Sequence, residues 1–202
     1  AAAETLKKAR MNFSAAVFGP GLGTGEAVQA FLGEVWDGWD APCVLDADAL
    51  TAIANGVEPP KAESVFTPHP GEMSRLMQSS VLEIQADRFA CAERAAERFS
   101  RCILLKGPYS VVAEPQQPLL VNCTGNAGLA TAGMGDVLSG IIGTLLAQDL
   151  PGYYAAACGM YWHGAAADAC AGEIGAVGYR ASDLIDRLPK TRSKLVSACE
   201  DP

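Results

Sequence analysis

The most constraining feature of this chain is a glycine-rich stretch over residues 124–136, which reads Thr-Gly-Asn-Ala-Gly-Leu-Ala-Thr-Ala-Gly-Met-Gly-Asp. An apolar run over residues 137–146 follows it directly and predicts a helix. A glycine-rich loop that opens a helix leaves main-chain N–H groups free and places the positive end of the helix dipole beside them. Such a position binds anions, most often phosphate groups. Asp136 would repel a phosphate there unless the chemistry needs it, and we therefore predict phosphate chemistry in which Asp136 acts on a hydroxyl group.

Length and charge exclude several classes of protein. With 202 residues the chain can bury one core, and we expect a single domain over residues 1–202. The formal net charge of −8 argues against a nucleic acid or an anionic membrane as partner. No run of the sequence reaches membrane-spanning length, and the first residues lack the basic start and apolar stretch of a signal peptide.

The cysteines predict a protein of the reducing cytoplasm. There are seven, none in a Cys-x-x-Cys pair, and only two histidines accompany them, so a zinc site is not expected. Most have apolar neighbours and resemble small core residues. They are Cys43, Cys91, Cys102, Cys123, Cys158, Cys170 and Cys199.

Short apolar strands alternate with helical patterns along the chain. Four buried strands are predicted over 15–18, 43–46, 65–66 and 102–106, and a hairpin over 111–113 and 119–121. Helices are predicted over 26–36, 81–99, 137–148, 152–171 and 181–188, with Leu82 and Phe89 on the apolar side of the second. This pattern indicates an α/β fold with a mostly parallel sheet, helices on both faces, and ligands at the carboxyl ends of the strands.

Several motifs follow the predicted strands, and each has a structural alternative. The glycines of 19–25 do not fit the dinucleotide fingerprint, and no Gly-Lys-Ser/Thr is present for a P-loop. They form either a tight turn or a close approach to a ligand. Of Asp46 and Asp48, we expect one to cap the next helix and the other to face the site through Mg²⁺ or water, without acting as a direct catalyst.

Three further residues and Asp136 are weighed in the same way. His69 lies between two prolines in a predicted extended loop, which favours ligand contact, whereas His163 lies in an alanine-rich helix and is predicted to be packed. Lys106 ends a strand and either extends to solvent or contacts phosphate. Asp136 has the alternative of stabilising its helix by ~0.3–1 kcal/mol.

Taken together, five segments resemble the ADP/ATP-dependent NAD(P)H-hydrate dehydratases of the ribokinase-like superfamily. The segments are 19–23 (Gly-Pro-Gly-Leu-Gly), 44–50 (Val-Leu-Asp-Ala-Asp-Ala-Leu), 67–72 (Thr-Pro-His-Pro-Gly-Glu), 106–107 (Lys-Gly) and 131–142 (Thr-Ala-Gly-Met-Gly-Asp-Val-Leu-Ser-Gly-Ile-Ile). They occur in order between residue 15 and about residue 188. The resemblance implies a ribokinase-like fold that lacks the N-terminal portion usual in the family, with Ser110 where threonine is common.

The resemblance also implies a lyase. NAD(P)HX, which is NAD(P)H hydrated at C6 of the nicotinamide ring, would be phosphorylated on that hydroxyl by ADP or ATP, with Mg²⁺ bridging the nucleotide phosphates. Phosphate would then leave and restore NAD(P)H. Asp136 would contact the hydrate and deprotonate it, Gly133 and Gly135 would form the anion hole, and no residue is assigned to a metal. The nucleotide would bind Lys106, Gly107, Pro108, Tyr109, Ser110 and Gly135, and the hydrated dinucleotide would contact Gly23 and His69.

Two other functions are compatible with these motifs. One is a small-molecule kinase of the same superfamily, which would leave a stable phosphorylated product. The other is an inactive remnant that binds the adenine nucleotide but lacks a wall for the second substrate. The resemblance further implies a functional link to an NAD(P)HX epimerase, and exposed sheet edges predict a homo-oligomer.

Overall fold

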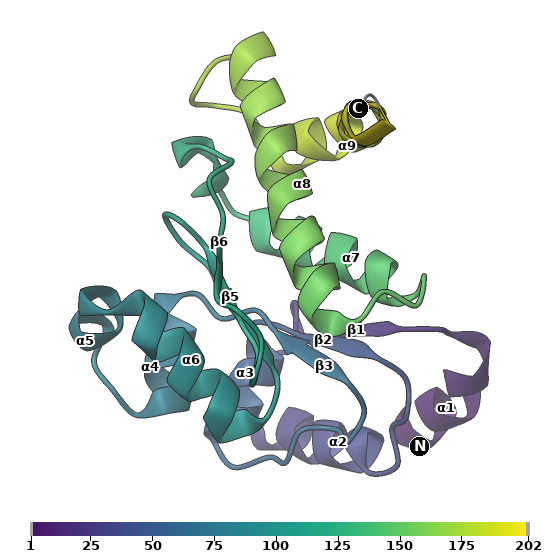
Figure 1. Cartoon of the computed structure of the whole chain (residues 1–202). Helices are drawn as coiled ribbons and strands as arrows, with labels where there is room; N and C mark the ends of the chain where they lie inside the picture. Colours follow the sequence, from purple (N-terminus) through teal and green to yellow (C-terminus); the bar gives the residue numbers. More distant parts are fainter. Residues whose placement is uncertain (1, 201–202) are drawn as a thin grey trace.

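The centre of the molecule is a six-stranded sheet with the strands in sequence order (Figure 1). The first four strands are parallel, and the last two add an antiparallel hairpin to the fourth. A computed structural model describes residues 2–200 of the chain, without the side chains of residues 199 and 200. The strands are β1 (Ala16–Phe18), β2 (Cys43–Leu45), β3 (Ser64–Phe66), β4 (Cys102–Leu105), β5 (Val111–Ala113) and β6 (Leu120–Val121).

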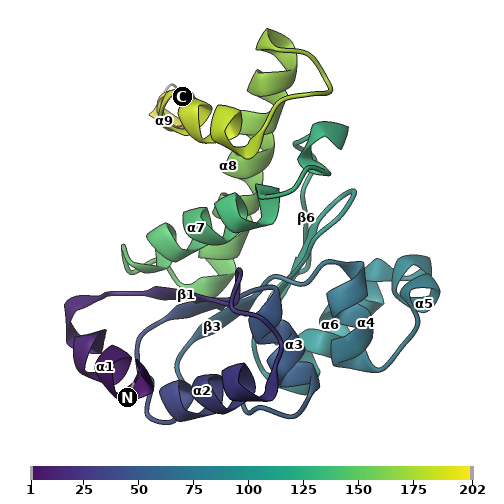
Figure 2. The ribbon, with the colours of Figure 1, turned by 180° about the vertical axis from the view of Figure 1, so that it is seen from behind.

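Helices cover both faces of this sheet, as predicted. Six helices pack on one face and two on the other, and the last helix lies on α8, away from the sheet (Figures 1 and 2). The first group is α1 (Ala2–Ala9), α2 (Glu26–Trp36), α3 (Asp48–Ala54), α4 (Pro70–Met77), α5 (Val81–Ala86) and α6 (Arg88–Phe99). The second group is α7 (Met134–Leu146) and α8 (Gly152–Glu173), and the last helix is α9 (Ala181–Glu200). Short 3₁₀ turns occupy Arg10–Asn12 and Ala127–Leu129.

The strands are apolar throughout because both of their faces are buried. Along β2 and β3, Leu45 and Phe66 pack with the first group of helices, whereas Val44 and Val65 pack with α7 and α8. Alternate residues of a strand point to opposite faces of the sheet, so two separate cores form. The carboxyl ends of the parallel strands meet at one edge, which is where polar loops were predicted to gather.

The prediction of one helix over 81–99 was wrong. The helix breaks at Asp87, whose φ of −147° is not helical and whose carboxylate accepts a hydrogen bond from the Ala90 N–H. Ser80 caps α5 separately. Leu82 and Phe89 are exposed and do not join the core.

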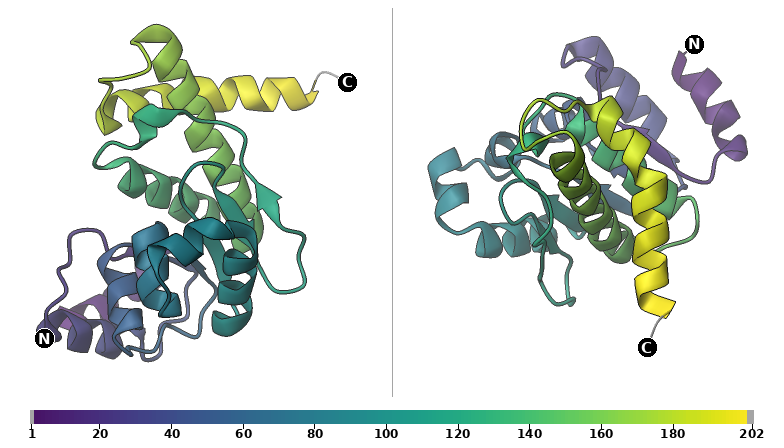
Figure 3. Two further views of the ribbon diagram at one scale, coloured as in Figure 1. Left: turned by 90° about the vertical axis from the view of Figure 1, so that its left-hand side faces the viewer. Right: turned by 90° about the horizontal axis from the view of Figure 1, so that it is seen from above.

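Two other boundaries differ from prediction. The loop expected over 67–72 ends at His69, because Pro70 occupies the first turn of α4, where a proline loses no helical hydrogen bond. Helix α9 continues through Pro189 to Glu200, and its contact with α8 includes a hydrogen bond from the Trp162 indole to the Leu188 carbonyl. Figure 3 shows the far half of α9 extending beyond the body of the molecule.

The cysteines are largely core residues, as predicted. The six described ones are free thiols: Cys43, Cys91, Cys102 and Cys170 are buried, and Cys123 and Cys158 are exposed. Cys199 lies outside the described side chains. Within residues 2–200, no helix combines the length and the apolar character that crossing a membrane would need.

Candidate active site

A buried ion pair lies at the carboxyl edge of the sheet. The Lys106 ammonium, at the end of β4, donates to the Asp46 carboxylate, at the end of β2, over 2.7 Å. The Ala47 N–H donates to the same Asp46 oxygen over 2.9 Å, and the Ser139 hydroxyl of α7 donates to the other oxygen over 2.6 Å. Asp46 is 1% exposed. Because its oxygens are held from three sides, Asp46 fixes both the lysine and the first turns of α7.

The prediction for Asp46 and Asp48 was partly wrong. Neither side chain caps α3, which begins without a side-chain cap. Asp48 instead accepts a hydrogen bond from the Gly23 N–H over 2.7 Å. Asp46 does not line the cavity, and it contacts the site through its ion pair with Lys106.

The N-terminus of α7 lies against this ion pair. Gly133 precedes the helix with a φ of +86°, a left-handed conformation that favours glycine. The N–H groups of Gly135 and Asp136 have no acceptor among the described residues, as expected for a first helical turn. A Cβ atom on Gly135 would lie 3.5 Å from the Lys106 ammonium, so the free amide and the cation are close neighbours. Amides, a helix dipole and a lysine therefore converge on one place that suits an anion.

Asp136 occupies the first turn of α7 and is exposed. Its carboxylate has no hydrogen-bond or ion-pair partner in the part of the chain that the structure describes. It follows Gly135 directly and therefore flanks the free amides.

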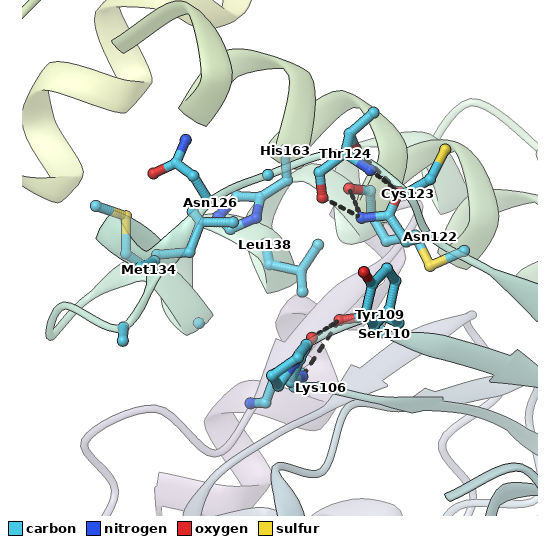
Figure 4. A pocket seen from close by; sticks show the side chains of 18 residues that line it. Lys106, Tyr109, Ser110, Asn122, Cys123, Thr124, Asn126, Met134, Leu138 and His163 are labelled. Atoms are coloured by element: carbon cyan, nitrogen blue, oxygen red, sulfur yellow. Dashed lines mark hydrogen bonds between the residues drawn. The ribbon is translucent and has the colours of Figure 1, made fainter. Parts of the chain in front are cut away.

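A cavity of about 590 Å³ opens beside Lys106, a size typical of sites for small molecules (Figure 4). The turn after β4 forms one wall, and a loop from β6 toward α7, together with α8, forms another. The lining residues are Lys106, Gly107, Pro108, Tyr109, Ser110, Asn122, Cys123, Thr124, Gly125, Asn126, Ala127, Leu129, Ala130, Met134, Gly135, Leu138, Met160 and His163. All six residues predicted to bind a nucleotide are among them.

Arg88 supports the turn that forms the first wall. Its guanidinium donates to the carbonyls of Leu105 and Lys106 over 3.1 and 3.2 Å. Gly107 has a φ of +142°, a conformation that L side chains rarely adopt, and a Cβ atom there would also come within 2.9 Å of the same guanidinium. Arg88 was not predicted from the sequence, because it lies in a helix 18 residues before the turn.

All three residues predicted to contact the hydrated dinucleotide, Asp136 among them, lie outside the cavity. Gly23 is exposed on the loop after β1. His69 caps α4: its Nδ1 accepts from the N–H groups of Gly71 and Glu72 over 3.0 and 3.3 Å, and Glu72 accepts from the His69 N–H. The His69 side chain is half exposed, and its Nε2 lies 3.3 Å from the Glu72 carboxylate, so both ring nitrogens have partners within α4.

His163 is buried, as predicted, but it also lines the cavity. It is 6% exposed, and its Nε2 has no hydrogen-bond partner among the described atoms. Burial lowers the pKa of His163 to about 4, the nearby Lys106 lowers it slightly, and a hydrogen bond to the Met134 main chain opposes both. The imidazole is therefore neutral near pH 7. In Figure 4 it lies across the cavity from Lys106.

The polar residues after β6 were also missed. The Asn122 side chain donates to the Thr124 carbonyl over 3.0 Å, and the Thr124 hydroxyl donates to the Tyr161 carbonyl of α8 over 3.0 Å. The run Asn-Cys-Thr-Gly-Asn after a strand was the available signal, because polar residues at the carboxyl end of a sheet face ligands in this class of fold.

The profile of the NAD(P)H-hydrate dehydratase family matches residues 1–190. The chain belongs to this family. It is 41% identical to the ADP-dependent (S)-NAD(P)H-hydrate dehydratase of Neisseria meningitidis serogroup B, an alignment that covers 97% of this chain and 68% of that protein. It also matches the longer bifunctional NAD(P)H-hydrate repair enzyme of Escherichia coli with 46% identity, over 86% of this chain and 33% of the enzyme.

Solved structures show the same fold. The NAD(P)H-hydrate dehydratase of Bacillus subtilis, co-crystallised with ATP and Mg²⁺, superposes with a TM-score of 0.82 at 35% identity, covering 90% of this chain and 64% of that one. A ribokinase-like protein of Enterococcus faecalis gives a TM-score of 0.83 at 27% identity, covering 95% of this chain and 66% of that one. The fold of this family member is therefore ribokinase-like, as the sequence predicted.

Proposed function

We propose that this chain is an ADP-dependent (S)-NAD(P)H-hydrate dehydratase, a lyase that acts through transient phosphorylation. One observation supports this most: the free amides at the start of α7 adjoin a lysine that a buried carboxylate holds in place, at the mouth of a cavity of nucleotide size. The family profile and the 41% identical relative of that name agree with it. The Bacillus structure with ATP supports an adenine nucleotide as co-substrate.

In this proposal the nucleotide occupies the cavity with its phosphates toward Lys106 and Gly135. The Lys106 ammonium and the amides of Gly133 and Gly135 would stabilise the negative charge of the transferring phosphoryl group, an anion hole built before the substrate arrives. The turn over residues 106–110 would hold the rest of the nucleotide. Asp46 would contribute indirectly, by holding Lys106 in position.

Asp136 is the proposed base. Transfer of the terminal phosphoryl group of ADP forms a P–O bond at the C6 hydroxyl, releases AMP, and passes the hydroxyl proton to Asp136. The C6–O bond then breaks, phosphate leaves, and a proton lost from the neighbouring ring carbon restores the double bond of NAD(P)H. A loose phosphoryl-transfer transition state asks more of positioning than of base strength, and the free carboxylate beside the amides suits that role.

The hydrated dinucleotide would approach from outside the cavity. Gly23, His69 and Asp136 are all exposed, and none of the three lines the nucleotide cavity. The two substrates would therefore meet at the N-terminus of α7 from different directions, as an in-line transfer requires.

Mg²⁺ fits this site as a companion of the nucleotide. Within the described residues, no group of three or more His, Cys, Asp or Glu side chains could hold a metal ion. The Asp46 oxygens already accept from Lys106, Ser139 and Ala47. Mg²⁺ commonly binds phosphate oxygens and water with few protein ligands, and when bound it would neutralise charge on the nucleotide phosphates.

An assay of ADP-dependent NADHX dehydration tests the proposal. The expected result is the appearance of NADH absorbance together with free phosphate and AMP. A stable phosphorylated product would favour a small-molecule kinase, and ADP binding without turnover would favour an inactive nucleotide-binding protein. A functional link to an epimerase, homo-oligomerisation and a cytoplasmic location remain predictions.

A further inference from the structure

One face of α8 supports the loop that forms the far wall of the cavity. This loop, residues 124–129, supplies five of the lining residues: Thr124, Gly125, Asn126, Ala127 and Leu129. Asp168 of α8 is exposed and does not line the cavity, yet it contacts the loop directly.

The two carboxylate oxygens of Asp168 accept hydrogen bonds from two adjacent residues of the loop. One oxygen accepts from the Gly125 N–H over 2.9 Å, and the other accepts from the Asn126 side-chain amide over 3.0 Å. The opposite end of the Asn126 side chain accepts from the Gly128 N–H over 3.0 Å and from the Tyr179 hydroxyl over 2.8 Å. Tyr179, which lies between α8 and α9, is 1% exposed. Through one asparagine, these contacts link the cavity wall to α8 and to the segment between α8 and α9.

The loop has little freedom to move against this support. A Cβ atom on Gly164, one turn before Asp168, would lie 2.2 Å from the Thr124 hydroxyl. A Cβ atom on Gly128 would lie 2.3 Å from the Tyr179 ring. Backbone and side chains therefore meet at van der Waals limits on both sides of the hydrogen-bonded residues.

We propose that Asp168 is a positioning residue of the nucleotide site, which holds residues 124–129 in the conformation that receives the adenine nucleotide. The inference rests on the proposed function, because it names a further residue of the same site. Without the carboxylate, the Gly125 N–H and the Asn126 amide lose their acceptor, and a loop that must then be ordered on binding lowers affinity. Asp168 acts through Gly125 and Asn126 and does not touch the reacting atoms.

The test is calorimetric titration of the whole chain with ADP in the presence of Mg²⁺. Asp168→Asn is expected to raise the Kd for ADP about tenfold, the change that corresponds to one lost charge-assisted hydrogen bond. It should raise the KM for ADP to the same extent and leave kcat at saturating ADP within about twofold. A loss of folded protein alone would lower kcat and leave KM unchanged, so the two roles are distinguishable.

Two further variants complete the test. Asp183→Asn is the matched control, because Asp183 also accepts from a main-chain N–H, that of Arg180 over 2.7 Å, but has no contact with the loop; its Kd for ADP should equal that of the wild type. Tyr179→Phe should raise the Kd for ADP about threefold, since Asn126 keeps its other hydrogen-bond partners. This second variant tests the same link if Asp168→Asn folds poorly.

The outcomes separate the two proposals. If the wild type binds ADP and both Asp168→Asn and Tyr179→Phe bind it equally well, the positioning role is overturned and the proposed function stands. If the wild type binds neither ADP nor ATP, the proposed function fails, and this inference fails with it.

Discussion

The Lys106 ammonium lies 2.7 Å from the Asp46 carboxylate, although 60 residues separate them. Asp46 is buried and the Lys106 side chain is 18% exposed, so removal of the Asp46 charge leaves the ammonium with the more distant Glu72 carboxylate, at 3.8 Å, as its remaining partner. Asp46→Asn should therefore lower the free energy of unfolding by about 3 kcal/mol and raise the KM for the nucleotide. Urea denaturation and steady-state kinetics measure both. Glu4→Gln is the control, because its pair with Lys8 is exposed and should contribute almost nothing.

The role of Asp136 predicts a separation of binding from turnover. An asparagine at this position cannot accept the hydroxyl proton, so Asp136→Asn should lower kcat at least about a hundredfold. The Kd for ADP should change less than about twofold, because Asp136 does not line the cavity. Asp149→Asn, just beyond the other end of α7, should leave both constants unchanged. An active Asp136→Asn protein would remove Asp136 from the mechanism.

His163 predicts a pH dependence of stability. Its pKa is about 4 in the folded chain and about 6.5 when unfolded, so the unfolded chain takes up a proton first as the pH falls. The contribution of neutral His163 to the free energy of unfolding is therefore complete above the pKa of the unfolded chain. It falls by about 2 kcal/mol between about pH 7 and pH 5, as the pH approaches the pKa of the folded chain. His163→Gln cannot be protonated there. Urea unfolding should show that the difference in free energy of unfolding between the two proteins becomes smaller as the pH falls. If the two free energies vary with pH in parallel, the depressed pKa of His163 is contradicted.

Two glycines of α8 predict opposite effects of the same substitution. Gly164→Ala places a methyl group 2.2 Å from the Thr124 hydroxyl and 2.7 Å from its main-chain carbon, so the loop must shift. Affinity for ADP should fall at least about tenfold, as for a site displaced by a fraction of an ångström. Gly172→Ala meets nothing within 4 Å and should stabilise the helix by about 0.5–1 kcal/mol. Titration and thermal unfolding would measure both; equal ADP affinities would show that the loop tolerates the shift.

The sequence predicted the sheet well because its strands are buried on both faces. Continuous apolar runs such as Cys43–Leu45 and Cys102–Leu105 are typical of strands at the centre of a parallel sheet that helices cover on both faces. The resemblance to the hydrate dehydratases implied one nucleotide site for Lys106 and Gly135, which lie close together in the fold. The break at Asp87 could not be predicted, because its side-chain cap competes with a helical pattern that is continuous in the sequence.

The cavity wall formed by α8 lay beyond sequence reasoning for a different reason. Alanine, glycine and aromatic residues of α8 lie on all sides of the helix. Its apolar periodicity therefore does not show which side faces a ligand. His163 could therefore be recognised as buried but not as lining a cavity. The partners of Asp168 lie about 40 residues earlier in the chain, and only the folded structure brings them together.

The three-way contact of Asp46 also makes the site cooperative. One carboxylate joins β2, β4 and α7, so the lysine and the start of α7 share a single anchor. A nucleotide that binds where these elements meet should therefore slow hydrogen exchange in all three of them together.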